Sequence, residues 1–216
     1  MEGRYVWQRL SQVVERAWRP KPASHRVHVD DRRASRALSL AVAEHLAAAR
    51  PEDSRVTIVC IGTDRSTGDA LGPLVGARLA GSASKSVRVL GTLDEPVHAA
   101  NLHDVLRGLY EDPDARPGTV IAVDACLGKS ESVGYISVKP GPLYPGTGVH
   151  KHLPPVGHFH IVGIVNVGGF MEYFVLQNTR LSLVMRMARV IADGLRLGLA
   201  QWSAAREAAV SRPAPR

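Results

Sequence analysis

Two uninterrupted apolar runs, RVTIVCIG at 55–62 and TVIAVDA at 119–125, constrain the fold most strongly. Apolar runs without polar alternation are typical of strands buried on both faces, as in parallel sheets. Helical patterns separate them from other strand-like segments. Helices are expected at 30–50, 69–81, 98–110 and 178–202, and further strands at 87–93, 134–142 and 158–167. This order predicts a three-layer α/β fold with a mostly parallel sheet between helices.

The chain divides into an arm, one domain and a tail. Apolar residues at helical spacing in 4–18, followed by the prolines of 19–25, predict an N-terminal helical arm and linker over 1–24. Residues 25–202 are expected to form a single α/β domain, and the proline-containing residues 203–216 a disordered tail. The last helix is expected to bury one stripe, consisting of Leu181, Val184, Met185, Ala188 and Ile191.

Charge and cysteine content narrow the classes of partner. The net charge is +7, but no motif combines basic with aromatic residues, so specific nucleic-acid binding is not expected. No apolar run is long enough to predict a membrane span. The two cysteines, Cys60 and Cys126, lie in or beside strand-like runs and suit a reducing cytosol better than a disulfide framework. A cytoplasmic protein is therefore expected.

Acidic residues follow three predicted strands. Asp64 and Asp69 come after the first, Asp94 and Glu95 after the second, and Asp124 near the end of the third. In open α/β sheets the ligand crevice lies beyond the carboxyl ends of the strands. These five carboxyl groups are therefore expected to gather at one rim of the sheet.

Two neighbouring carboxyl groups can share a proton and hydrolyse an amide by acid–base chemistry. A divalent metal held by carboxylates and a histidine is the alternative. Asp69 also stands three residues after Ser66, a spacing that fits a helix cap, and Asp64 could bond backbone N–H groups in its turn. A phosphate cradle at 62–73 is disfavoured, since neither the P-loop lysine nor a G-x-G-x-x-G pattern is present.

Other segments leave several interpretations open. His150, His152, His158 and His160 lie close together and could bind a metal or stay solvated. Cys126 could be a nucleophile, although its apolar neighbours favour a buried structural thiol. The aromatic, apolar run after Gly168 and Gly169 favours core packing, with a substrate groove or a subunit contact of a homo-oligomer as alternatives. Five segments of the sequence carry a resemblance to a known family: GTDRSTGDALGPLVG, GTLDEPVHAANL, VDACLG, GPLYPGTGV and GIVNVGGFMEYFVLQNTRL.

Together these segments, in this order over about 55–197, resemble the YyaC family of sporulation proteins, regarded as spore proteases. The family is more distantly similar to germination protease and to the hydrogenase maturation endopeptidases. The resemblance implies a phosphorylase/hydrolase-like, hydrogenase maturation protease-like fold. It matches Asp69 in TGDALGP and Asp124 in VDACLG to the catalytic pair of germination protease.

The resemblance also implies a role and a setting. It implies a sporulation-associated endopeptidase in the forespore or mother cell, with small acid-soluble spore proteins as substrates and the N-terminal arm as a candidate pro-segment. No cofactor is required, but the maturation endopeptidases bind nickel at the corresponding acidic positions with a histidine. The candidate third ligands here are His98, His150, His152 and His158. The chain departs from the family pattern at His158, where an acidic residue is common.

The sequence therefore predicts Asp69 and Asp124 as the catalytic pair. The residues expected to shape the site or bind substrate are Asp64, Asp94, Glu95, Asn101, Gly168 and Gly169. Two other functions stay open: a sporulation binding or regulatory protein without turnover, and a metal-dependent hydrolase of another bond.

Overall fold

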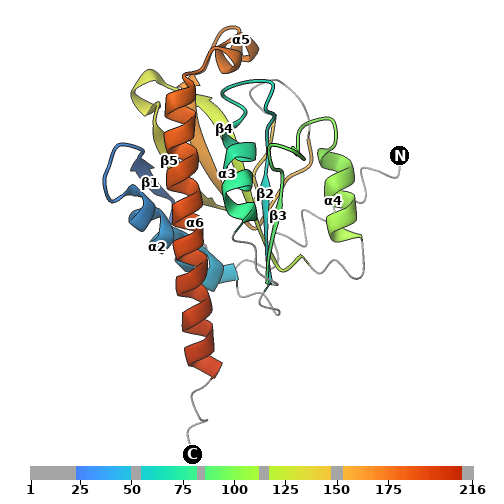
Figure 1. The fold of residues 1–216 in the computed structure, drawn as a ribbon, viewed down its shortest axis with the longest axis vertical. Coiled ribbons are helices and arrows are strands. Elements are labelled where there is room, and N and C mark those ends of the chain that lie inside the picture. Colours follow the sequence, from blue (N-terminus) through green and yellow to red (C-terminus); the bar gives the residue numbers. More distant parts are fainter. Residues whose placement is uncertain (1–22, 50–54, 82–85, 112–116, 147–152, 211–216) are drawn as a thin grey trace, which may run out of the picture.

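The computed structural model describes residues 23–49, 55–81, 86–111, 117–146 and 153–210. These residues form a six-stranded sheet in the order β1-β5-β6-β4-β2-β3, with helices on both faces (Figure 1). The strands are β1 His25–His28, β2 Val56–Cys60, β3 Val87–Leu90, β4 Thr119–Gly128, β5 Tyr135–Pro140 and β6 Phe159–Val167. The helices are α2 Ala34–Ala49, α3 Leu71–Ala80, α4 Leu102–Tyr110, the 3-10 turn η1 Ser130–Ser132, α5 Glu172–Gln177 and α6 Leu181–Val210. The expected three-layer α/β fold is confirmed.

The sheet is mostly parallel. Strand β2 pairs in parallel with β3 and β4, and β4 pairs in parallel with β6. Strand β5 runs antiparallel to β6, and β1 antiparallel to β5. All five residues of β2 are buried, which explains why its sequence lacks polar alternation.

The two faces of the sheet are covered unequally (Figure 1). Helices α2, α3 and α6 pack on one face around a core that includes Ile58, Ile121 and Ile161. We call this the three-helix face. The other face is covered by α4 and by apolar residues of nearby loops, around Val59, Val120 and Ala122; we call this the α4 face. Side chains alternate between faces along each strand, so each strand contributes to both cores.

Helix α6 departs from the expectation at both ends. It continues to Val210, so residues 203–210 are helical and the expected disordered tail is wrong for them. Leu181 and Met185 are 57% and 37% exposed, so their expected burial is wrong, whereas Val184, Ala188 and Ile191 are buried as expected. The buried stripe continues instead through Met187, Ala192 and Leu195. The expected arm helix at 4–18 and residues 211–216 lie outside the described residues.

No helix within the described parts of the chain is long and apolar enough to cross a membrane.

Candidate functional site

Strands β2 and β4 are neighbours whose outgoing connections diverge. After β2 the chain passes through α3 to β3, and after β4 it continues to β5, on the opposite side of the sheet. The carboxyl end of such a neighbouring pair is the topological switch point, where open α/β sheets bind ligands. Asp69 follows β2 and Asp124 lies on β4, so the two expected catalytic residues flank this point.

Asp124 lies where β4 loses one of its neighbours. The last registered pair of β2 and β4 is Cys60 with Val123, whereas β4 continues beside β6, with Asp124 opposite Val162. The half-buried carboxyl group of Asp124 therefore adjoins the open end of β2. Its Oδ1 accepts a hydrogen bond of 2.8 Å from the backbone N–H of Ala125. Alternation along the strand places the side chain on the α4 face, with Ala122 and Cys126.

Asp69 is held by the loop that joins β2 to α3. Its backbone oxygen accepts a hydrogen bond from Thr63 at 3.2 Å, which closes the loop. Helix α3 begins at Leu71, and its N-cap residue is Ala70, with no side-chain cap hydrogen bond. The alternative in which Asp69 caps this helix is therefore wrong. Its half-buried carboxyl group remains available for another role.

Both carboxyl groups have raised pKa values, chiefly because they are buried. Burial raises the pKa of Asp124 to about 8, against a smaller lowering by the Ala125 N–H, and the negative charge of Asp69 raises it further. Burial also raises the pKa of Asp69, while the Ser66 hydroxyl lowers it. One aspartate can thus stay protonated near pH 7 while the other ionises. Such an arrangement can activate water and protonate a carbonyl oxygen.

The other expected acidic residues lie at the rim without joining the pair. Asp64 is exposed, and its Oδ1 accepts a weak hydrogen bond of 3.4 Å from the Thr63 hydroxyl rather than from backbone N–H groups. Asp94 and Glu95 are exposed in the turn after β3. Asn101 accepts a hydrogen bond from His98 N–H at 2.8 Å and donates one to Pro96 O at 2.9 Å, so its amide holds the adjacent loop.

The Gly168–Gly169 segment uses its backbone N–H groups internally. Gly168 donates to Gly128 O at 2.8 Å, and Gly169 donates to the Glu172 carboxylate at 3.1 Å. Both N–H groups are therefore already hydrogen-bonded in this structure and are not available to a substrate.

The run after these glycines is largely exposed and includes the short helix α5. Phe170 is 86% exposed and Tyr173 is 66% exposed, so the expected core packing is wrong for these side chains, although Leu176 packs against the core of the three-helix face. Helix α5 is tied to the loop that carries Asp69, because Gly68 N–H donates to Leu176 O at 2.9 Å. It therefore borders the candidate site.

The structure does not bring His158 to the aspartates. Its Nδ1 accepts a hydrogen bond from Val120 N–H at 2.9 Å, four positions before Asp124 on β4. Four strand residues span about 13 Å, too far for one metal ion. His160 bonds instead to Gly141 O, and His98 to Ala100 N–H. Within the described ranges, no three His, Cys, Asp or Glu side chains gather to hold a metal. His150 and His152 lie outside those ranges.

Cys126 does not have the surroundings of an activated nucleophile. Burial and the charge of Asp124 raise the pKa of its thiol to about 11. A thiol in that state is poorly ionised at neutral pH, and the thiolate is the reactive form. The structural interpretation of Cys126 is therefore favoured.

Sequence reasoning missed two features near the site. Ser66 is 5% exposed beside Asp69, and its signal was the S-x-x-D spacing that also fits a cap. The second is a cavity between the end of β3 and α4, with Val97 and His98 in its wall. No sequence pattern indicates a cavity built by side chains from separate elements.

Comparisons with known proteins show what this chain is similar to. A family model described as a protein of unknown function, DUF1256, matches residues 26–194. The uncharacterized protein YyaC of Bacillus subtilis (strain 168) is 58% identical over 145 residues, covering 66% of this chain and 68% of that protein. Among solved structures, the NiFe hydrogenase maturation protease HycI from Thermococcus kodakarensis KOD1 has 18% identity and a TM-score of 0.42, covering 67% of this chain and 94% of that chain.

Proposed function

The chain belongs to the DUF1256 family of proteins of unknown function, and we propose that this member is an endopeptidase that uses Asp69 and Asp124. The resemblance to the YyaC family is confirmed by the 58% identical relative. The observation that carries the proposal is the position of two half-buried carboxyl groups, Asp69 after β2 and Asp124 on β4, at the switch point of the sheet. A binding protein without turnover would not need to keep an aspartate protonated near neutral pH.

The proposed mechanism assigns a role to each carboxyl group. Ionised Asp69 takes a proton from a water molecule, whose oxygen attacks the carbonyl carbon of a peptide bond. Protonated Asp124 donates its proton to the carbonyl oxygen, which gives a tetrahedral intermediate. Collapse of the intermediate breaks the C–N bond as Asp69 returns its proton to the departing amine. Asp124 recovers its proton from one hydroxyl of the intermediate, which leaves a carboxylic acid and restores both aspartates. Because the acid must be protonated, cleavage should fall as the pH rises through about 8.

The metal-dependent alternative remains a proposal without a complete ligand set in the described residues. Asp69 and Asp124 would supply two oxygen ligands, and a third ligand would have to come from residues such as His150. Carboxylates suit hard divalent cations, and a histidine would broaden the choice. No step of the mechanism above depends on such an ion. The sporulation setting, with small acid-soluble spore proteins as substrates, is likewise proposed from family resemblance alone.

The test replaces each aspartate by asparagine, which keeps the size of the side chain and removes its acid–base chemistry. Purified variants are incubated with small acid-soluble spore proteins, and the fragments are measured by mass spectrometry. We expect Asp69→Asn and Asp124→Asn each to lower the cleavage rate by about a hundredfold or more. The matched control is Asp104→Asn, an exposed carboxyl group on α4 paired with Arg107, which should cleave at the wild-type rate. Wild-type cleavage by either active-site variant would rule out the pair.

A further inference from the structure

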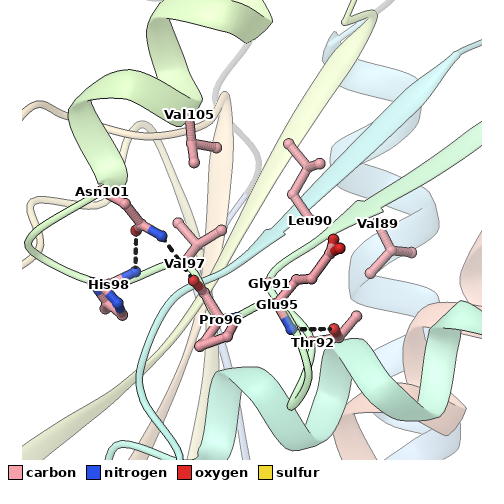
Figure 2. Close-up of a pocket in the computed structure, with 10 residues that line it drawn as sticks. All are labelled: Val89, Leu90, Gly91, Thr92, Glu95, Pro96, Val97, His98, Asn101 and Val105. Atoms are coloured by element: carbon pink, nitrogen blue, oxygen red, sulfur yellow. Dashed lines mark hydrogen bonds between the residues drawn. The ribbon is translucent and has the colours of Figure 1, made fainter.

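A cavity of about 340 Å³ opens at the edge of the sheet beside β3 (Figure 2). Its walls come from the end of β3, the loop after it and the first turns of α4. The residues that line it are Val89, Leu90, Gly91, Thr92, Glu95, Pro96, Val97, His98, Asn101 and Val105. Strand β3 is the last strand of the sheet on this side, so the cavity can be reached from solvent.

The polar framework of this cavity is fixed by hydrogen bonds that are already formed. Thr92 N–H donates to Glu95 O, and Glu95 N–H donates to the Thr92 hydroxyl, both at 3.1 Å. On the other side, the Asn101 side chain bonds to Pro96 O and to His98 N–H (Figure 2). A cavity with walls fixed in this way loses little conformational entropy on binding.

The cavity walls are mostly apolar and include one charged side chain. Val89, Leu90, Val97 and Val105 supply aliphatic surface. The Glu95 side chain extends across β3 towards Leu90 and Val89, with its carboxylate over the apolar wall (Figure 2). No basic side chain in the described ranges forms an ion pair with Glu95 that the structure records. Lysine and arginine have the complementary form, an aliphatic stem with a terminal cation.

The cavity is linked to the aspartate pair by hydrogen bonds between neighbouring backbone segments. Gly62 N–H donates to Val97 O at 2.8 Å, and Ile61 N–H donates to Val123 O at 2.7 Å. Val97, Ile61 and Val123 therefore stand side by side across three neighbouring segments. Two strand spacings amount to about 10 Å, which an extended peptide covers in about three residues.

We propose that this cavity is a subsite for a lysine or arginine side chain of a protein substrate, about three residues from the bond that the aspartate pair cleaves. The position relative to the bond rests on the proposed function, whereas binding of the basic side chain to the cavity does not. The aliphatic stem would lie against Val97 and Val105, and the cation would pair with the Glu95 carboxylate.

The first test measures binding alone. Three acetylated, amidated pentapeptides, with lysine, norleucine or glutamate between pairs of alanines, are titrated into the full chain and followed by backbone amide NMR. We expect the lysine peptide to bind about tenfold more tightly than the norleucine peptide and to shift the amides of Val97, His98 and Val105. Equal affinities, or shifts confined to other residues, would overturn the proposal.

Variants of the charge sharpen this test. Glu95→Gln should remove the preference for lysine, and Glu95→Lys should transfer it to the glutamate peptide. The Glu95 hydrogen bonds in its turn come from the backbone, so both variants should fold, which circular dichroism checks. Glu131→Gln, another exposed carboxylate, is the matched control and should keep the preference for lysine. A lysine preference that survives in both Glu95 variants would overturn the proposal.

A cleavage assay separates this inference from the proposed function. Asp124→Asn should bind the lysine peptide as the wild type does but should not cleave longer peptides that contain lysine. If Asp124→Asn still cleaves while the Glu95 dependence holds, the aspartate mechanism fails and the subsite stands. If cleavage needs Asp124 but ignores lysine at every position up to four residues from the bond, the subsite fails and the mechanism stands.

Discussion

The three-helix face and the α4 face of the same sheet differ in how tightly they are closed. On the three-helix face, α6 approaches α2 so closely that a Cβ atom on Gly194 would lie 2.8 Å from Leu38 Cβ. On the α4 face, one helix and loop residues cover the strands. Asp124 lies on the α4 face, and the cavity beside β3 opens next to α4. The thinner cover of the α4 face leaves room for a site, whereas the thicker cover of the three-helix face supplies stability.

Truncation of a buried leucine on each face should give the largest difference. Leu38 and Leu106 are both almost fully buried, on the three-helix face and the α4 face respectively. We expect Leu38→Ala to lower the free energy of unfolding by about 4 kcal/mol and Leu106→Ala by about 2 kcal/mol, because loop-covered surroundings relax into a cavity more easily. Urea denaturation measures both. Leu40→Ala, on the exposed side of α2, is the control and should change stability by less than about 0.5 kcal/mol.

The pH dependence of the free energy of unfolding should show how much the buried carboxyl group of Asp124, on the α4 face, destabilises the fold when it is ionised. The pKa of Asp124 is raised to about 8 when folded, against about 4 when unfolded. The folded state therefore holds a proton that the unfolded state releases. The stability contributed by that proton is fully present below about pH 4 and is lost as the pH rises through about 8.

Asp124→Asn removes this dependence because asparagine does not titrate. We expect it to be more stable than the wild type at pH 8 by about 2 kcal/mol, allowing for water that reaches a half-buried group, and closer to it at pH 5. Chemical denaturation at the two pH values measures the difference. A wild-type stability that rises between pH 5 and pH 8 relative to Asp124→Asn would contradict the assigned pKa direction.

The two helix glycines should respond to alanine with opposite signs. Gly194→Ala forces a methyl group against Leu38 and should cost about 1–2 kcal/mol. Gly108→Ala adds a methyl group in open space on α4 and should stabilise by about 0.5–1 kcal/mol through higher helix propensity. Thermal denaturation of the two glycine variants measures both changes. A Gly194→Ala variant as stable as the wild type would show that α6 and α2 are not closely packed at Gly194.

The smallest change in stability is expected for a substitution that lies outside both faces of the sheet. Phe170 is 86% exposed in the bend before α5, so Phe170→Ser should change the free energy of unfolding by less than about 0.5 kcal/mol. The melting temperature checks this value. A loss above about 1 kcal/mol would indicate that Phe170 packs against the protein in solution.

The sheet was largely predictable because its central strands are encoded locally. The apolar runs of β2 and β4 indicate burial on both faces without knowledge of their neighbours. Strand β1 was missed because its four residues include two histidines and an arginine, and it forms only by pairing with β5 far along the chain. The burial of Leu181 and Met185 was mispredicted because periodicity marks a helical stripe but not how far the neighbouring elements extend along it.

The candidate site was predictable to the level of strand ends. The rule that ligands bind beyond the carboxyl ends of strands led to five acidic residues at one rim. The family resemblance singled out Asp69 and Asp124 among them, and both lie at the switch point. The rule did not reveal that α3 begins at Leu71, two residues after Asp69, which removes the capping alternative. Nor could it reveal that the N–H groups of Gly168 and Gly169 are occupied, because their acceptors depend on the fold of residues far apart.

The contact between Gly68 and Leu176 limits how relatives of this chain can vary. A Cβ atom at Gly68 would lie 2.7 Å from the Leu176 side chain and 3.0 Å from its backbone oxygen. A larger residue at position 68 thus requires helix α5 to shift as well. Sequence changes in the loop of Asp69 and in α5 should therefore be inherited together, so that lineages which remodel one also remodel the other.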